Sequence, residues 1–216
     1  MTTRQKTKVK ICGIKDDKNL NIAIKAGTDF IGFVFYPPSP RYVEPRTALK
    51  LAEKLPKNIN SVALFVNPAD EDLIKAKGLD MIQLHGNETP QRVMEIKDLA
   101  GCHIIKALRI GKSKDLEQIT PYEDSADWLL FDAKPTSTQG DVLPGGTGKS
   151  FDWSLLYSIN FKKPWMLSGG LNTKNVKRAI SQLSPDAVDV SSGVEGRRGK
   201  KDAEKIQIFI ETVKNI

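Results

Sequence analysis

Short apolar runs recur along the whole chain and alternate with stretches whose apolar residues lie three or four positions apart. The apolar runs predict strands of a parallel sheet, because such strands are covered on both faces. We expect eight strands, over residues 9–13, 30–35, 61–66, 81–84, 104–108, 128–132, 165–167 and 186–190. The helical spacing predicts helices over residues 19–26, from 45, over 69–77, from 90, between 170 and 186, and over 201–213.

This alternation of strands and helices predicts the α/β class and favours one domain over residues 1–216, a single (β/α)8 TIM barrel. An open doubly wound sheet is the alternative, but no glycine-rich dinucleotide fingerprint follows the first strand. The fifth unit is the weakest, because residues 111–118 indicate a short or irregular segment. Residues 133–151 form a long glycine-rich loop, and like residues 37–42 they are candidates for a lid.

Composition and charge limit the partners. The chain has 216 residues and a formal net charge of +7. Its basic residues are scattered and match no nucleic-acid-binding motif, so we expect a small anionic substrate rather than nucleic acid. No apolar run reaches the length of a membrane span, and the basic start lacks the apolar core of a signal peptide. Cys12 and Cys102 give no disulfide framework, which favours a cytoplasmic protein with free thiols.

Two turns of small residues follow the last two expected strands. Glycine lets backbone N–H groups approach a ligand, and the start of a helix adds unsatisfied N–H donors. In a (β/α)8 barrel the loops after strands seven and eight form the usual phosphate site. The residues that we expect to bind phosphate are therefore Gly169, Gly170, Ser191, Ser192 and Gly193. Two ordinary turns of an α/β protein are the alternative.

In a barrel, the residues at the carboxyl ends of the strands face the active site. Here they offer a thiol, an amide, an imidazole, guanidinium groups and carboxylates: Cys12, Arg41, Gln83, His85, Arg109, Asp132 and Asp189. The set has no cluster with metal-ligand spacing, so we expect no metal, and it lacks the serine–histidine arrangement of a hydrolase.

Each of these residues has a functional and a structural interpretation. Cys12 is either a nucleophile or base in its thiolate form, or a small buried apolar residue. Asp132 ends an apolar strand, where a carboxyl can donate a proton or merely bond to the next loop. Arg41 can bind a carboxylate through its fork of N–H donors or be a surface charge. For His85, a polar structural neighbour is at least as good an interpretation as catalysis.

Two further stretches are assigned no function. Residues 145–150 end like a nucleotide-binding loop, but that pattern needs a glycine where the chain has Leu143. The basic residues Arg197, Arg198, Lys200 and Lys201 are expected to form a solvated turn.

Together the motifs resemble the phosphoribosylanthranilate isomerase family, from Lys10 to the end of the chain. The matching blocks are Lys10-Ile11-Cys12-Gly13-Ile14, Gly32-Phe33-Val34-Phe35, Ser39-Pro40-Arg41-Tyr42-Val43, Val62-Ala63-Leu64-Phe65-Val66-Asn67, Gln83-Leu84-His85-Gly86, Phe131-Asp132, Gly145-Gly146-Thr147-Gly148, Phe151-Asp152-Trp153, Leu167-Ser168-Gly169-Gly170-Leu171 and Asp189-Val190-Ser191-Ser192-Gly193-Val194-Glu195. The first and third blocks are specific by themselves. Arg198 departs from the family, which often has proline before Gly199, at a position outside the expected chemistry.

The resemblance implies a cofactor-free Amadori rearrangement of N-(5-phosphoribosyl)anthranilate to 1-(2-carboxyphenylamino)-1-deoxyribulose 5-phosphate in tryptophan biosynthesis. It implies that Asp132 is the general acid at the ribose ring oxygen and that Cys12 is the base at C2. It also implies that Arg41 binds the anthranilate carboxylate. Gln83, His85 and Asp189 are expected to bind substrate. Both monomers and homodimers occur in the family, so either state is open here.

Two alternatives remain at this point. One is another phosphoribosyl-type barrel enzyme, similar to indole-glycerol-phosphate synthase or to the aminoaldose isomerase of histidine synthesis. The other is a non-catalytic phosphosugar-binding protein. The synthase resembles enzymes with a catalytic lysine–glutamate pair and the histidine-pathway isomerase those with two catalytic aspartates, so neither calls for Cys12 at the end of a strand. A binding protein has no need of a thiol opposite a carboxyl.

Overall fold

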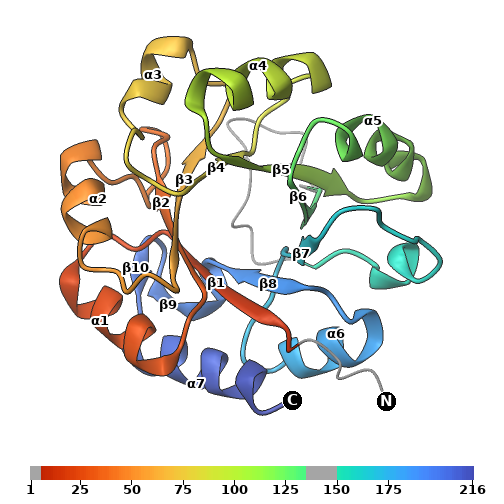
Figure 1. Ribbon diagram of the computed structural model, residues 1–216. Helices are drawn as coiled ribbons and strands as arrows, with labels where there is room; N and C mark the ends of the chain where they lie inside the picture. Colours follow the sequence, from red (N-terminus) through yellow and green to blue (C-terminus); the bar gives the residue numbers. More distant parts are fainter. Residues whose placement is uncertain (1–5, 135–149) are drawn as a thin grey trace.

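The computed structural model describes residues 6–134 and 150–216. Eight parallel strands form a closed barrel in which each strand pairs with the next and β8 pairs with β1 (Figure 1). The strands are β1 (Lys8–Cys12), β2 (Phe30–Val34), β3 (Asn60–Phe65), β4 (Met81–Leu84), β5 (His103–Ile110), β6 (Trp128–Ala133), β7 (Trp165–Leu167) and β8 (Ala187–Val190). The predicted (β/α)8 barrel is confirmed, and the open sheet is excluded because β1 and β8 share a ladder.

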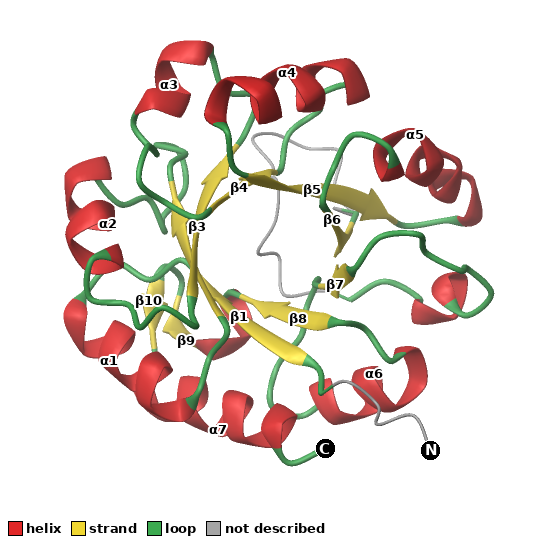
Figure 2. Ribbon diagram, in the orientation of Figure 1, coloured by secondary structure: helices red, strands yellow, loops and turns green. Residues whose placement is uncertain are grey.

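The helices surround the barrel on its outside (Figure 2). The α-helices are α1 (Asp17–Ala26), α2 (Pro45–Ala52), α3 (Asp70–Ile74), α4 (Pro90–Ala100), α5 (Ile119–Glu123), α6 (Val176–Leu183) and α7 (Ala203–Lys214). Short 3-10 helices are η1 (Ser113–Gln118), η2 (Trp153–Leu156) and η3 (Ser192–Val194).

Local sequence accounts for the helix ends. The side chain of Asp16 accepts a hydrogen bond from the N–H of Asn19 and caps the start of α1, and Gly27 ends the helix with a φ of 89°. Thr89 caps α4 in the same way, through the N–H of Arg92. These are the caps that a sequence pattern can reveal, since they lie within four residues of the helix end.

The structure departs from the prediction in three places. The fifth unit is irregular as expected, with η1 followed by the short α5, but the sixth strand is followed within the described residues only by the 3-10 helix η2. The third helix ends at Ile74 rather than near residue 77. A hairpin of β9 (Glu195–Arg197) and β10 (Lys200–Lys201) was not predicted, and α7 starts after it because Asp202 caps its first turn through the N–H of Lys205.

Apolar side chains pack in two layers. One fills the barrel interior and comprises Phe30, Val62, Met81, Ile105, Ala107, Leu130, Met166 and Ala187. The other lies between the barrel and the helices and includes Val9 and Ile11 of β1. Successive side chains of a strand point to opposite faces, so Lys10 and Cys12 point into the barrel above the inner layer. Polar groups therefore collect inside the barrel towards the carboxyl end of β1.

Some predictions fall on residues outside the described part of the chain. These are most of the loop 133–151 that we considered as a lid, and residues 145–149 of the glycine-rich run. Among residues 6–134 and 150–216, no helix has the length and apolar character needed to cross a membrane.

Candidate active site

A pocket of about 550 Å³ lies at the carboxyl ends of the barrel strands. Seven of the residues predicted to act in the site line it: Cys12, Arg41, Gln83, His85, Asp132, Asp189 and Ser191. Tyr36, Ser39 and Ser168 contribute further polar groups. Residues at the carboxyl ends of four strands (β1, β4, β6 and β8) and in the loop after β2 thus meet in a single cavity.

Cys12 ends β1 at the edge of this pocket and is buried. Burial raises the pKa of its thiol, because a thiolate is costly to form away from water, while the positive charge of Lys10 acts in the opposite direction. Cys12 pairs in register with Gly32, and a Cβ on Gly32 would lie 3.0 Å from Sγ and 3.2 Å from Nζ of Lys10. Glycine at position 32 thus leaves space for the thiol and the ammonium together.

Asp189 is held on both of its carboxylate oxygens. Nζ of Lys10 donates to Oδ1 at 2.8 Å, and Oγ of Ser168 donates to Oδ2 at 2.9 Å. Burial would lower the pKa of Lys10, but Asp189 and Cys12 outweigh it and raise the pKa above its usual value. Lys10 is therefore a fixed positive charge beside the thiol, and Asp189 holds that charge in place.

Asp132, at the end of β6, contacts the imidazole of His85 across the barrel. Its Oδ2 lies 3.1 Å from Nε2 of His85, and its Oδ1 accepts the N–H of Ala133 at 2.8 Å. Nδ1 of His85 lies 3.0 Å from Nε2 of Gln83. Gln83 and His85 therefore form a buried chain that leads to the carboxyl of Asp132.

Arg41 does not lie at the surface, and much of its guanidinium is already engaged. Nε and Nη2 donate to the two carboxylate oxygens of Glu195 at 2.8 and 3.0 Å. Burial alone would raise the pKa of Glu195, but the hydrogen bonds and charges of Arg41 and Lys201 lower it from 4.5 to about 2. The fork that was expected to grip a substrate carboxylate is thus used for Glu195.

The prediction that Lys201 lies in a solvated turn is wrong. Its side chain is only 3% exposed, and Nζ contacts Oε1 of Glu195 at 3.1 Å and donates to the carbonyl of Ser191 at 2.8 Å. The β9–β10 hairpin turns this lysine inwards, which the run of neighbouring basic residues did not reveal.

We predict that Glu195→Gln destabilises the protein at pH 7 by on the order of 3 kcal/mol, because Arg41 and Lys201 lose a buried counter-charge. The native pKa of Glu195 is below its usual value of 4.5. The carboxylate therefore stabilises the fold fully above about pH 4.5, and this contribution disappears as the pH falls towards 2. Urea unfolding of both proteins at pH 7, 4.5 and 3 measures it, with the exposed Glu204→Gln as control. A difference that does not change with pH contradicts the assignment.

The two turns expected to bind phosphate lie against each other. A Cβ on Gly193 would come 1.9 Å from the carbonyl oxygen of Leu171, so the turn after β8 packs onto the turn after β7. Gly169 has a φ of 83°, and its Cβ would lie 2.6 Å from the nitrogen of Ala133. The geometry differs from expectation in one respect, since α6 begins only at Val176 and not at the glycine turn. Gly169, Gly170, Ser192 and Gly193 are not among the residues that line the pocket.

Comparison with known proteins identifies the chain. Residues 9–212 match the family model described as N-(5'phosphoribosyl)anthranilate (PRA) isomerase. The chain belongs to the PRA isomerase family. The predicted family, its enzymatic class and its place in tryptophan biosynthesis are thereby confirmed.

Individual relatives agree with this membership. The N-(5'-phosphoribosyl)anthranilate isomerase of Paramagnetospirillum magneticum is 47% identical over 209 residues, which cover 95% of this chain and 96% of the relative. The phosphoribosyl anthranilate isomerase of Thermotoga maritima is a similar solved structure, with a TM-score of 0.86, 37% identity, and coverage of 97% of this chain and 100% of the other. A further solved structure, of phosphoribosyl anthranilate isomerase in complex with reduced 1-(o-carboxyphenylamino)-1-deoxyribulose 5-phosphate, has a TM-score of 0.84, 35% identity, and coverage of 97% of this chain and 100% of the other.

Several groups of the site in this PRA isomerase family member were not predicted from its sequence. Lys10, Ser168 and Glu195 hold the predicted residues in place, but none was singled out. Lys10 had a usable signal, because it lies two residues before Cys12 on one strand and therefore shares its face. Glu195 had none, since it is 154 positions from Arg41.

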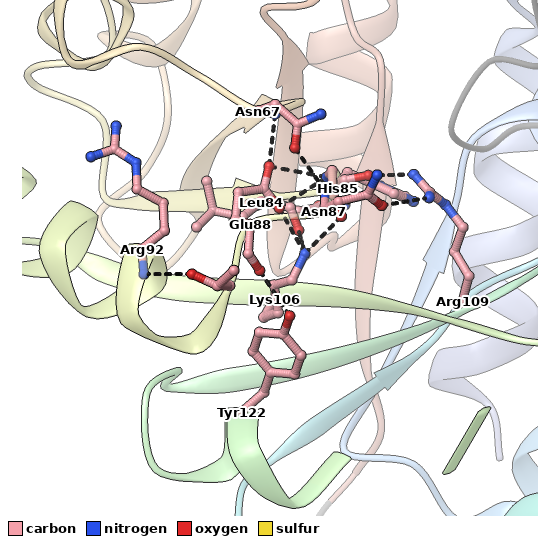
Figure 3. Close-up of polar contacts among 12 residues, drawn as sticks. Asn67, Leu84, His85, Asn87, Glu88, Arg92, Lys106, Arg109 and Tyr122 are labelled. Carbon is pink, nitrogen blue, oxygen red and sulfur yellow. Dashed lines mark hydrogen bonds and ion pairs between the residues drawn. The ribbon is translucent and has the colours of Figure 1, made fainter. Parts of the chain in front are cut away.

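Lys106 and Glu88 form a second buried ion pair, with Nζ and Oε2 2.7 Å apart (Figure 3). Lys106 also donates to the carbonyl of Gly86 at 3.0 Å, and Glu88 accepts the N–H of Gly86 at 3.0 Å. Arg109 donates through Nη2 to the carbonyl of His85 at 2.7 Å. Arg109 was one of the strand-end candidates, and its contacts fix the backbone that carries His85.

Proposed function

We propose that Cys12 and Asp132 carry out the rearrangement of N-(5'-phosphoribosyl)anthranilate in this chain, as base and acid respectively. The observation that supports this most directly is that both side chains line one pocket, from the non-adjacent strands β1 and β6. Proton transfer at two atoms of one sugar requires two groups that reach it from different walls of a cavity.

The proposed reaction is balanced as follows. The carboxyl of Asp132 gives its proton to the ribose ring oxygen, whose bond to C1 breaks while the nitrogen lone pair forms an iminium. The thiolate of Cys12 then takes the C2 proton, and the electron pair of that C–H bond forms the C1–C2 double bond. The π electron pair of the C1–nitrogen double bond moves to nitrogen and neutralises its positive charge. The enolamine finally tautomerises to the ketone. Asp132 ends as carboxylate and Cys12 as thiol, and solvent resets both.

The surroundings of Cys12 support its role as a base. Burial raises the pKa of the thiol, which makes the thiolate, when formed, a stronger base. The ammonium of Lys10, held by Asp189, stabilises that thiolate. The iminium in turn makes the C2 proton more acidic, so that a thiolate is a sufficient base.

Substrate anchors complete the proposal. The two turns that hold Gly169, Gly170, Ser191, Ser192 and Gly193 are suited to the phosphate, because Gly193 packs against Leu171, directly after the first turn, and small residues let backbone N–H groups approach an anion. Gln83, His85 and Asp189 line the pocket in which the sugar end of the substrate is expected to lie. Arg41 takes the anthranilate carboxylate, and since Nε and one N–H of Nη2 bond to Glu195, it does so through Nη1 and the second N–H of Nη2.

For Arg41→Met we predict that KM rises about tenfold or more while kcat changes less. A carboxylate far from C2 contributes mostly uniform binding, and one hydrogen bond between charged groups is worth about 1.5–3 kcal/mol. Steady-state kinetics measures both constants, and Arg46→Met on the exposed face of α2 is the matched control. An unchanged KM would remove Arg41 from the substrate site.

We also propose a cytoplasmic location, with a small anionic phosphosugar as the partner and with a monomer or homodimer as the working state. Both cysteines are free thiols, as a reducing compartment allows.

The deciding experiment mixes the purified protein with N-(5-phosphoribosyl)anthranilate and follows the fluorescence of the anthranilate group. Catalytic change of the signal is expected, whereas the Cys12→Ala/Asp132→Asn double variant should bind without turnover. A wild-type protein that binds the compound stoichiometrically but never turns it over is a phosphosugar-binding protein, and the proposal is then wrong.

A further inference from the structure

The imidazole of His85 lies between two partners, and each of its ring nitrogens faces one of them. Nδ1 is 3.0 Å from Nε2 of Gln83, and Nε2 is 3.1 Å from Oδ2 of Asp132. All three residues are buried, with exposed fractions of 6% for His85, 0% for Gln83 and 5% for Asp132. The hydrogen bonds among these buried side chains therefore restrict where the protons of the three groups can lie.

The donor and acceptor types fix where the proton lies in this arrangement. An amide nitrogen only donates, so Nδ1 accepts from Gln83 and the proton of a neutral ring is on Nε2. That N–H donates to Oδ2 of Asp132, while Oδ1 already accepts the N–H of Ala133 at 2.8 Å. Both bonds suit a carboxylate. This arrangement therefore suits Asp132 in the form that exists after an acid has given its proton away.

Gln83 has an unused oxygen that allows the other arrangement. Within residues 6–134 and 150–216, its Oε1 is buried and has no hydrogen-bond partner. Half a turn of the amide would place Oε1 opposite Nδ1, which must then carry the ring proton. Nε2 becomes an acceptor and can take a hydrogen bond from a protonated Asp132. Apart from the exchange of Nε2 and Oε1 of Gln83, the two arrangements keep the same contacts. The second arrangement has one more proton, which is on the carboxyl of Asp132.

The backbone around His85 is held by hydrogen bonds, so a movement of the backbone does not account for the change between the two arrangements. Its N–H donates to the carbonyl of Phe65 at 2.9 Å and its carbonyl accepts from Arg109 at 2.7 Å. The next residue, Gly86, is held by Lys106 and Glu88. Rotation of the Gln83 amide needs no movement of this loop.

Other charged groups surround the chain of three residues from several elements. Cys12 of β1, Arg41 after β2 and Asp189 of β8 line the same pocket, Arg109 of β5 contacts the His85 carbonyl, and Lys106 of β5 pairs with Glu88 behind Gly86. In the described part of the chain, none of these groups forms a hydrogen bond or ion pair with a ring nitrogen of His85. Gln83 is therefore the group that distinguishes Nδ1 from Nε2.

We propose that Gln83 is a positioning residue for the acid: the orientation of its amide selects the ring nitrogen of His85 that carries the proton, and so whether Asp132 is held as carboxylate or as carboxylic acid. This inference rests on the proposed role of Asp132 as the acid. It assigns Gln83 to the acid rather than to the substrate.

The chain offers a direct spectroscopic test, because it contains only two histidines, and His103 has a side chain that is 73% exposed. Protein labelled with ¹⁵N-histidine gives one set of ring signals for each. At pH 8 the wild type should show His85 protonated on Nε2. In Gln83→Glu a carboxylate, which can only accept, faces Nδ1, and the ring should become protonated there. A His85 ring with the same protonation in both proteins overturns the proposal.

Kinetics supply the second measurement. Gln83→Met has no donor or acceptor, and kcat should fall about tenfold, the size of one uncharged hydrogen bond, while KM stays within about twofold. Gln91→Met on the exposed face of α4 is the control and should leave both constants unchanged. A rise in KM with unchanged kcat would make Gln83 a substrate-binding residue instead.

These outcomes separate the inference from the function beneath it. A wild type without isomerase activity, or an Asp132→Asn variant with normal turnover, refutes the proposed function and says nothing against the NMR result. An active wild type whose His85 ring is protonated on Nδ1 or on both nitrogens at pH 8 refutes the inference alone, even if neither Gln83 variant folds.

Discussion

Replacing Asp132 by asparagine is expected to lower kcat by about 10²–10⁴-fold, the contribution of one positioned proton-transfer group. Asparagine has nearly the same shape, and its amide can still bond to the N–H of Ala133 and face His85. What it lacks is a proton that can be given to the ribose ring oxygen. Ring opening is the first step, so its loss limits every later one.

The measurement is steady-state turnover of N-(5-phosphoribosyl)anthranilate by fluorescence, with thermal unfolding as a check on the fold. KM should change only a few-fold, because the substrate is anchored elsewhere. Asp98→Asn, on the exposed face of α4, is the matched control and should leave kcat and KM unchanged. Turnover close to that of the wild type in Asp132→Asn would exclude this carboxyl as the acid.

Removing the thiol in Cys12→Ala should reduce kcat by on the order of a hundredfold or more, because the C2 proton then has no positioned base. Cys12→Ser is the sharper companion variant. It keeps a small polar side chain beside Lys10, but a hydroxyl does not ionise near neutral pH. Cys102→Ala is the control, since this half-buried cysteine precedes β5 at the opposite end of the barrel.

The pH dependence follows from the direction of the shift at Cys12. Burial raises the pKa of the thiol, so only a small fraction is thiolate near pH 7. On the acidic side of its pKa, kcat/KM of the wild type should therefore rise as the pH rises, by up to about tenfold per unit. Full activity in Cys12→Ser, or a serine variant with the same pH profile, would show that the base is another group.

The two variants also report on different steps. Ring opening needs only the acid, so Cys12→Ala can still open the ring and form the iminium, whereas Asp132→Asn cannot. Exchange of the C2 hydrogen with deuterated water, followed by mass spectrometry, requires both steps. It should be lost in both variants, but in Asp132→Asn the loss arises before the C2–H bond is made acidic.

The alternation of short apolar runs with helical spacing was enough to determine the barrel, because each strand of a parallel sheet is buried on both faces and each helix on one. The carboxyl ends of the strands could be located from the same pattern, and in a closed barrel of parallel strands these ends meet at one end of the barrel. This is why Cys12, Gln83, His85, Asp132 and Asp189 were expected in one pocket from sequence alone. Local caps such as Asp16 and Gly27 belong to the same class of information.

Only the tertiary structure decided which of these groups bind one another. Arg41 is paired with Glu195, Lys10 with Asp189, and His85 with Asp132, across separations that no local period encodes. The inward turn of Lys201 depends likewise on the β9–β10 hairpin. A sequence pattern reports how a residue relates to its own strand or helix. The partner of a buried charge depends instead on how distant strands meet around the barrel, and at these positions that partner sets which charges and protons the site can hold.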